Sequence, residues 1–254
     1  MTARRIISVA NQKGGVGKTT TAVNLASCLA ISGKRTLLVD LDPQANSTSF
    51  LGIDKSTVTT STYEVVINGV PVREAAIPTG VDRLDILPSA IRLVGAEVEM
   101  VEMSGRESRL KDALADSNLP YEFIIIDCPP SLNILTLNAL VASGSVLIPV
   151  QTEYFALEGL GLLLDTINRI KGSLNPELEI EGVLLTMYDS RLNLSRQVEA
   201  EARKFFAGKV YQTVIQRNVR LAEAPGFGKP IVLYDMLSAG AENYVSLAKE
   251  VIAS

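Results

Sequence analysis

Two lysines and two threonines lie in one short glycine-rich stretch, Asn11–Thr20, with the sequence N-Q-K-G-G-V-G-K-T-T. Glycines allow backbone N–H groups to approach phosphate oxygens, and a helix that begins in such a loop adds unpaired donors and a positive dipole end. Lys18 is placed to reach β- and γ-phosphates and Thr19 to ligate Mg²⁺. The pattern departs from G-x-x-x-x-G-K-[ST], because Gln12 replaces the first glycine and Lys13 adds a second cation. The stretch predicts a nucleotide-binding loop.

Three carboxylates follow apolar runs that are typical of buried strands. Asp40 and Asp42 end or follow the run at 36–40, and Asp127 ends the run at 123–127. The carboxyl ends of parallel strands form the edge where ligands bind in an open α/β sheet. Asp127 is predicted to hold Mg²⁺ directly or through water, Asp42 to orient an attacking water, and Asp40 to support the metal or Thr19. A single carboxylate at such a position can also be a helix cap or a turn former.

The elements that must position these residues alternate between strand and helix. This order predicts a doubly wound α/β fold, with a mostly parallel sheet flanked by helices and a single domain over 1–254. A polar loop is expected at 43–62, helical structure with breaks at Gly95 and Gly105 at 91–119, and a helix cap at Ser131. Strands are expected at 6–10, 36–40, 84–88, 123–127, 145–150, 180–187 and 210–215, and helices at 17–32, 62–68, 72–76, 131–142, 153–171, 193–206 and 238–252.

Composition excludes several classes of protein. The chain has 254 residues, of which 47% are hydrophobic and 20% charged, as expected of a globular domain with a sizeable core. A net charge of −4 means that any contact with nucleic acid must come from a local basic cluster. Histidine is absent, which excludes His-based catalysis and ligation, and Cys28 and Cys128 have no metal-binding spacing. The apolar stretch 137–150 is too short to span a bilayer, so a cytoplasmic protein is expected.

Four motifs resemble the ParA/Soj chromosome- and plasmid-partitioning ATPases, which are P-loop NTPases of the deviant Walker A type. The resemblance covers essentially the whole chain in order. The phosphate loop alone is typical of a wider class of ATPases that includes division-site, nitrogenase-reductase and metabolic members. The other three motifs narrow the resemblance to the ParA/Soj ATPases. The motifs are K-G-G-V-G-K-T-T at 13–20, L-V-D-L-D-P-Q at 38–44, I-D-C-P-P-S at 126–131 and N-V-R-L-A-E-A-P at 218–225.

The resemblance implies a Mg²⁺-dependent ATPase that forms a homodimer with ATP between the subunits. Lys13 resembles the signature lysine that crosses to the partner's phosphates, and Asp42 the residue that activates water. Lys18 and Thr19 resemble the intrinsic phosphate and Mg²⁺ ligands, and Thr20 contacts the phosphates. The implied nucleotide-binding residues are Lys13, Gly14, Gly15, Val16, Gly17, Lys18, Thr19, Thr20, Met187, Arg217 and Asn218, and the implied metal site comprises Thr19, Asp40 and Asp127. Gln216 departs from the proline that relatives commonly have near the nucleobase.

The family binds DNA without sequence preference, and Arg191 and Arg220 resemble its DNA-contacting arginines. Other cations nearby could extend this patch, although two glutamates interleave with them as on an ordinary solvated helix face. A ParB-like DNA-bound activator and a nucleoid-associated location are implied. The additional cations are Arg196, Arg203, Lys204 and Arg217, and the glutamates are Glu199 and Glu201.

Alternatives come from related classes of ATPase. A MinD-like membrane-associated positioning ATPase would need a basic amphipathic helix at its end, and 241–254 contains Lys249 as its only cation. A metabolic or electron-transfer ATPase would need an acceptor site or bridging cysteines, for which Cys128 is poorly suited. A ParA-like ATPase that positions a non-DNA cargo also fits the motifs. With four residues before Arg5, no operator-binding helix-turn-helix domain is expected.

Overall fold

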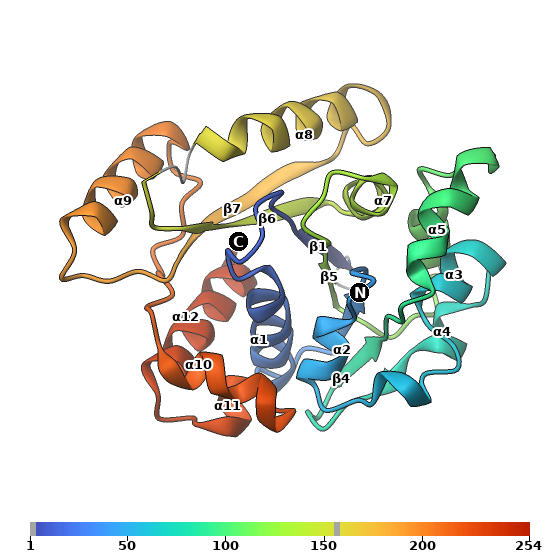
Figure 1. The fold of residues 1–254 in the computed structure, drawn as a ribbon, viewed down its shortest axis with the longest axis horizontal. Coiled ribbons are helices and arrows are strands. Elements are labelled where there is room, and N and C mark those ends of the chain that lie inside the picture. Colours follow the sequence, from blue (N-terminus) through green and yellow to red (C-terminus); the bar gives the residue numbers. More distant parts are fainter. Residues whose placement is uncertain (1–3, 155–157) are drawn as a thin grey trace.

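The chain forms one seven-stranded sheet in the order β3-β4-β2-β5-β1-β6-β7, covered by helices on both faces (Figure 1). This architecture is seen in a computed structural model that describes residues 4–154 and 158–254. All neighbouring strands pair in parallel except the short edge strand β3, which is antiparallel to β4. The strands are β1 (Arg5–Val9), β2 (Thr36–Asp40), β3 (Ile77–Pro78), β4 (Leu84–Leu87), β5 (Phe123–Asp127), β6 (Ser145–Gln151) and β7 (Glu179–Thr186). The predicted fold class is confirmed.

The helices divide between the two faces of the sheet. Short 3₁₀ segments are η1 (Lys55–Thr57), η2 (Met100–Glu102), η3 (Glu158–Leu160) and η4 (Ala224–Phe227). The α-helices are α1 (Lys18–Ile31), α2 (Asn46–Phe50), α3 (Thr62–Asn68), α4 (Val72–Ala75), α5 (Leu93–Glu99), α6 (Arg109–Leu114), α7 (Ile134–Ala142), α8 (Gly161–Ser173), α9 (Asn193–Phe205), α10 (Val219–Glu223), α11 (Ile231–Tyr234) and α12 (Ala239–Ala253). None of the helices within the described ranges is long and apolar enough to cross a membrane.

Two hydrophobic cores follow from the alternation of side chains along the strands. In β5, Ile124 and Ile126 face the core under α3 and α5 to α8, whereas Ile125 faces the core that contains α1 and α12. Strand residues buried on both faces explain why the central strands are continuous apolar runs. Because α1 packs against the sheet and is flanked by α12 and α2, nearly all of its side chains are buried, and Thr21 meets Tyr244 of α12 at 3.2 Å (Figure 1).

The strand register places the predicted site residues at the carboxyl edge of the sheet. Val9, the last residue of β1, is paired with Asp127 of β5, and Asp127 is also paired with Asp40 at the end of β2. The glycine-rich loop leaves β1 at this edge and enters α1 at Lys18. The loop and the strand-end carboxylates therefore converge, as the parallel sheet required.

Several predicted boundaries are wrong. Residues 210–215 form no strand, because only isolated bridges at Val210 and Gln216 join this segment to β7 and the residues that follow it. The helix expected over 153–171 begins as α8 at Gly161, and residues 155–157 lie outside the described part of the chain. The expected loop at 43–62 contains α2 and η1, and the short helices α10 and α11 and the strand β3 were not predicted.

The two remaining local predictions that differ concern helix ends. Ser131 does not cap α7; Asn133 does, because its Oδ1 accepts hydrogen bonds from the N–H groups of the second and third helical residues at 3.1 and 3.2 Å. Gly95 lies inside α5 and does not interrupt it. Gly105 breaks the helical region as predicted, since it adopts a φ of 65° that continues no right-handed helix.

Candidate functional site

The glycine-rich loop between β1 and α1 is open on the side that a ligand would approach. Gly15 and Gly17 have φ values of 77° and 88°, which side-chain-bearing residues rarely adopt. A Cβ atom at Gly14 or Gly15 would meet no atom within 4 Å. Gly17 is the N-cap of α1 and offers no side-chain cap, so the N–H groups of the first turn are free of a capping side chain. This arrangement suits an anion bound by backbone donors.

Side chains from distant strands hold the loop in place. Asn11 accepts a hydrogen bond from the Lys13 N–H at 3.0 Å and donates to the Pro149 carbonyl of β6 at 2.8 Å. Thr186, at the end of β7, donates its hydroxyl to the Val16 carbonyl at 2.9 Å and is buried. Hydrogen bonds thus connect the loop to both β6 and β7.

Lys18 is buried within the loop, with 6% of the residue exposed. Its Nζ donates to the carbonyl of Lys13 at 2.9 Å. Burial lowers the pKa of Lys18, and the nearby Asp127 opposes that shift by favouring the charged form. Phosphate oxygens would offer this buried cation charge-assisted hydrogen bonds, which are stronger than its bond to a neutral carbonyl.

Lys13 lies apart from this arrangement. Its amine forms an ion pair with Glu153, which follows β6, and both side chains are partly exposed. Within the chain, Lys13 therefore contributes its backbone to the loop, whereas its charge is turned towards Glu153.

Asp127 is fully buried and only partly satisfied. Its Oδ2 accepts a hydrogen bond from the Ser47 hydroxyl at 2.8 Å, and both this hydroxyl and that of Thr19 act to lower the pKa of the Asp127 carboxylate. Its Oδ1 has no hydrogen-bond partner among the described residues. Burial and the neighbouring Asp40 raise the pKa of Asp127 to about 8. A buried acceptor without a partner is what a cation, or water bound to one, would satisfy.

The donor set fits Mg²⁺. Thr19 and Asp127 supply hard oxygen atoms next to the loop, and Mg²⁺ usually keeps several waters and takes one or two protein oxygens together with substrate phosphates. Among the described residues, no cluster of three or more His, Cys, Asp or Glu forms a cage made of protein ligands alone. A site completed by phosphate and water agrees with both observations.

Asp40 and Asp42 differ in what their carboxylates do. Asp40 is fully buried; its Oδ2 accepts from the N–H and hydroxyl of Thr48 at 2.8 and 2.7 Å, and its Oδ1 accepts from the Asp42 N–H at 3.3 Å. Burial raises the pKa of Asp40 to about 6. Both Asp40 oxygens thus accept protein donors, and its predicted role as a metal ligand stays a prediction. The Asp42 carboxylate accepts from the Gln44 N–H at 2.9 Å through its Oδ1.

A cavity of about 310 Å³ adjoins the loop and gathers residues that are distant in sequence. Met187, Arg217 and Asn218, predicted on the nucleobase side, all line it together with Thr20. Gly17 and Gln216, also named from the sequence, line it too, as do Leu221 and Ala222 of the 218–225 motif. The sequence did not point to the three remaining lining residues, because no local motif marks them; they are Thr186, Ile215 and Tyr244.

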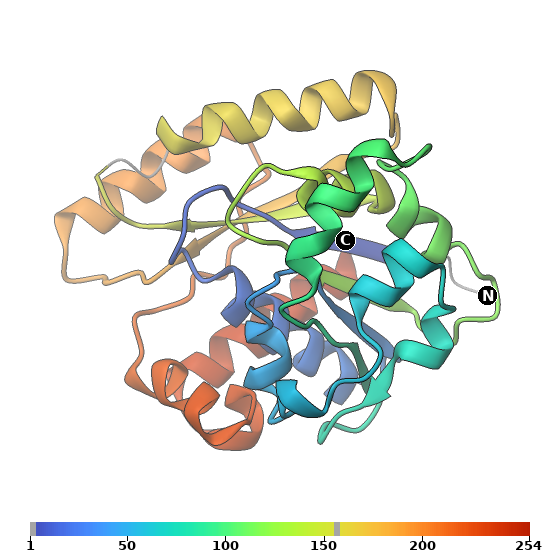
Figure 2. The same cartoon turned by 45° about the vertical axis from the view of Figure 1, so that its right-hand side comes forward.

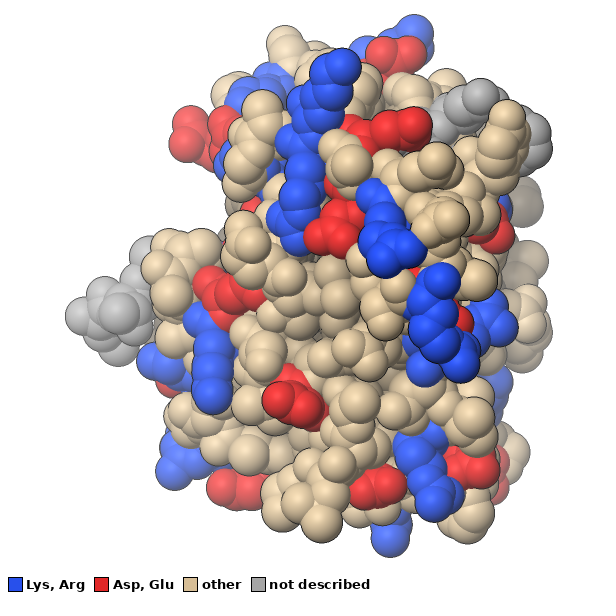
Figure 3. All heavy atoms as spheres, turned by 90° about the vertical axis from the view of Figure 1, so that its left-hand side faces the viewer, with Lys and Arg blue, Asp and Glu red and all other residues tan. Residues whose placement is uncertain are grey.

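The two arginines predicted to contact DNA are exposed but locally paired. Arg191 forms an ion pair with Asp189 at 2.7 Å, and Arg220 pairs with Glu223 at 2.9 Å and Asp235 at 3.4 Å. Figure 3 shows Lys and Arg side chains spread over one face of the molecule, with acidic side chains between them. On α9, Arg203 pairs with Glu199 one turn away, as the solvated-face alternative predicted.

The fold and the loop define a P-loop NTPase of the α/β class. A family model described as an AAA domain matches residues 4–180. The chain is 57% identical over 250 residues to the sporulation initiation inhibitor protein Soj of Bacillus subtilis (strain 168), covering 98% of this chain and 99% of that protein. It is 53% identical over 251 residues to the chromosome partitioning protein ParA of Myxococcus xanthus (strain DK1622), covering 99% and 89%. The chain belongs to the ParA/Soj family of ATPases, which confirms the resemblance.

A solved structure supports the same class. Cobyrinic acid a,c-diamide synthase from Mycobacterium smegmatis, with bound ADP and magnesium, superposes with a TM-score of 0.85 at 38% identity, covering 97% of this chain and 93% of that one.

Proposed function

We propose that this protein is a Mg²⁺-dependent partitioning ATPase that dimerises on ATP, binds DNA without sequence preference and is reset by hydrolysis. One observation carries the nucleotide site: the buried Lys18 amine and the unpartnered Asp127 Oδ1 lie at the same open glycine loop. The partitioning role is supported by relatives named for chromosome partitioning and by a similar structure with ADP and magnesium. Residues 1–254 would form a single ATPase domain.

The phosphates would be held by the loop N–H groups from Gly14 to Thr20 and by Lys18. Thr19 and Asp127 would hold Mg²⁺, which neutralises charge on the β- and γ-phosphates. Asp42 would orient the attacking water, since its Oδ1 accepts from the Gln44 N–H and its other carboxylate oxygen accepts no hydrogen bond from the described residues. Asp40 would position this segment, because it holds Thr48 and the Asp42 backbone.

Lys13 would serve the second subunit of the dimer. Its amine is not engaged with its own loop, and its partner Glu153 is partly exposed, so the ion pair is worth little in water and is readily broken. In related NTPases, a cation supplied by a partner stabilises the transition state of phosphoryl transfer and raises kcat by roughly 10³- to 10⁵-fold. ATP occupancy and dimerisation would therefore be coupled.

Arg191 and Arg220 would bind DNA through its phosphates. Contacts to phosphates carry no sequence information, so this binding would be independent of DNA sequence. Both arginines are paired with carboxylates of the same chain, so binding requires that phosphates compete for them. A ParB-like DNA-bound protein would stimulate hydrolysis, and the site of action would be the nucleoid in the cytoplasm.

Nucleotide-dependent dimerisation and Mg²⁺-dependent phosphate release are measured together to test the ATPase part of the proposal. Purified protein is incubated with ADP, ATP or a non-hydrolysable analogue, with and without Mg²⁺, and its mass is followed by light scattering. We expect a dimer with ATP and the analogue only, and phosphate release that requires Mg²⁺. A protein that neither binds ATP nor releases phosphate would contradict the assignment.

A further inference from the structure

One side of α5, η2 and the turn that precedes α5 carries a row of exposed aliphatic side chains. Ile91, Val94, Val98 and Val101 follow one another at intervals of three and four residues, and each is more than half exposed. This spacing places them along one face of a helix. We refer to these four residues as the aliphatic row. Figures 1 and 2 show α5 on the outside of the molecule, in two views 45° apart.

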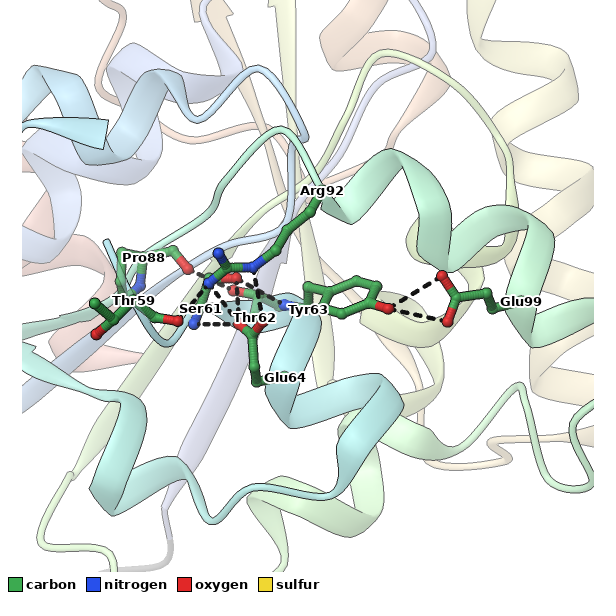
Figure 4. A network of polar contacts seen from close by, with 8 residues as sticks. All are labelled: Thr59, Ser61, Thr62, Tyr63, Glu64, Pro88, Arg92 and Glu99. Carbon is green, nitrogen blue, oxygen red and sulfur yellow. Dashed lines mark hydrogen bonds and ion pairs between the residues drawn. The ribbon is translucent and has the colours of Figure 1, made fainter. Parts of the chain in front are cut away.

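The opposite side of α5 is firmly attached to the protein. Leu93, Ala96 and Met100 are fully buried. Polar contacts with the start of α3 add to this packing (Figure 4): Arg92 donates to Glu64 at 2.8 Å, and the Tyr63 hydroxyl donates to Glu99 at 3.0 Å. The aliphatic row is therefore presented to solvent by a fixed helix.

Folding gives no reason for these residue types. Valine and isoleucine are weaker helix formers than leucine or alanine, because their branched side chains lose rotamer freedom against the preceding turn. Exposed as they are, they gain little from burial in the folded chain. A contiguous exposed apolar surface is typical of a site that contacts another molecule.

A groove lies beside the aliphatic row. Its cavity of about 400 Å³ is lined by Val101 of the row, by Glu97, and by residues at the start of α7 that include Leu132, Asn133 and Leu137. Asn133, the N-cap of α7, donates its side-chain amide to Glu97. A helix lying on the row could insert side chains into this groove, as amphipathic helices do in hydrophobic grooves.

Charges around the row select the kind of partner. Glu97, Glu99 and Glu102 surround it, and none of them forms an ion pair with another described residue. The arginines in the same region, Arg92 and Arg106, are already paired with Glu64 and Glu107. The surface thus has uncompensated negative charge. It would repel a second copy of itself and an anionic membrane, and attract a cationic partner.

We propose that the aliphatic row and its groove bind an amphipathic helix of another protein, with aliphatic residues on one face and Lys or Arg along its edges. The apolar face would cover the row, and the cations would pair with Glu97, Glu99 and Glu102. This surface is formed by residues other than those of the nucleotide site, so it can be tested without ATP.

The test uses the whole protein and a synthetic helical peptide with leucines on one face and lysines on both edges. Two control peptides are a scrambled sequence of the same composition and an analogue with glutamate for lysine. Binding is measured by fluorescence anisotropy over a salt series. The protein variants are Val98→Ser with Val101→Ser, and, as a control, Val219→Ser on α10; Val98 and Val219 are 74% and 72% exposed. Thermal unfolding verifies that each variant is folded.

We expect the lysine peptide to bind and both control peptides to bind at least about tenfold more weakly. Val98→Ser with Val101→Ser should weaken binding by about tenfold or more, and Val219→Ser should leave it unchanged. Glu99→Gln with Glu102→Gln should reduce the salt dependence. Absence of binding, equal binding of the glutamate peptide, or equal loss in Val219→Ser would overturn the proposal. The proposal would also be overturned if the protein associated with itself, or bound phosphatidylglycerol vesicles, and Val98→Ser with Val101→Ser abolished that interaction.

Discussion

Replacing Lys18 by methionine tests the phosphate loop most simply, because methionine keeps much of the aliphatic length and removes the charge. The lysine amine is buried and held by a single carbonyl at 2.9 Å, so in the complex it would make charge-assisted bonds to phosphate in a site shielded from solvent. Hydrogen bonds to charged groups contribute about 1.5 to 3 kcal/mol. The dissociation constant for ATP should therefore rise roughly 10- to 150-fold.

The assay is titration calorimetry with Mg²⁺ and a non-hydrolysable ATP analogue. Lys34→Met is the matched control, since Lys34 follows the other end of α1 and pairs with Glu122 at 3.1 Å, far from the loop. Thermal unfolding should show that both variants remain folded. If Lys18→Met bound the analogue as tightly as the parent protein, the lysine would not contact phosphate and the loop assignment would fail.

Three further predictions concern the carboxylates and the DNA surface. Asp42→Ala should retain ATP and accumulate as a dimer, with phosphate release reduced by about 100-fold or more; normal turnover would remove Asp42 from the reaction. The pKa of Asp127 is raised from 3.8 to about 8, so the folded protein holds a proton that the unfolded chain has released, and stability is lost as pH rises through this range. Asp127→Asn has no carboxyl proton to lose, so its stability should not fall in this way. In urea unfolding without nucleotide, the free energy of unfolding of Asp127→Asn minus that of the parent should therefore rise by more than about 1.4 kcal/mol between about pH 5 and about pH 8. A difference that stays constant with pH would refute this. Arg220→Glu should abolish DNA retention in a filter assay while ATP-dependent dimerisation persists, and undiminished DNA binding would exclude Arg220 from the surface.

The sequence predicted the features that depend on neighbours along the chain. The loop at 11–20 and the strand ends at Asp40 and Asp127 were predictable, because apolar runs mark buried strands and parallel strands must align their carboxyl ends. Their convergence at one edge follows from topology alone.

Contacts between distant segments could not be predicted in this way. The pairing of Lys13 with Glu153 joins residues 140 positions apart, and Thr186 reaches Val16 across 170 positions. Nothing in the local sequence of either partner encodes such a contact. The same holds for Tyr244, which reaches the cavity beside the loop from the terminal helix.

Tertiary partners also decide local contacts that the sequence does not show. Asp40 ends an apolar run, and its oxygens accept hydrogen bonds from Thr48 and Asp42, while its role as a metal ligand stays a prediction. The segment containing Thr48 was expected to be a loop because it is rich in Ser and Thr. It forms α2 instead, where Ser47 and Thr48 bond to Asp127 and Asp40.

The central claim is that ATP occupancy creates a dimer and that the dimer binds DNA. The most direct measurement is sedimentation of the parent protein and Lys13→Ala with a DNA duplex of arbitrary sequence, in ADP, ATP or a non-hydrolysable analogue, over a salt series. For the parent protein we predict DNA-bound dimers with ATP and the analogue only, weakening with salt by a log–log slope of about −0.9 per phosphate neutralised. Lys13→Ala should bind nucleotide yet remain monomeric and free of DNA. Equal DNA binding in ADP and ATP, or normal dimerisation of Lys13→Ala, would contradict the coupling.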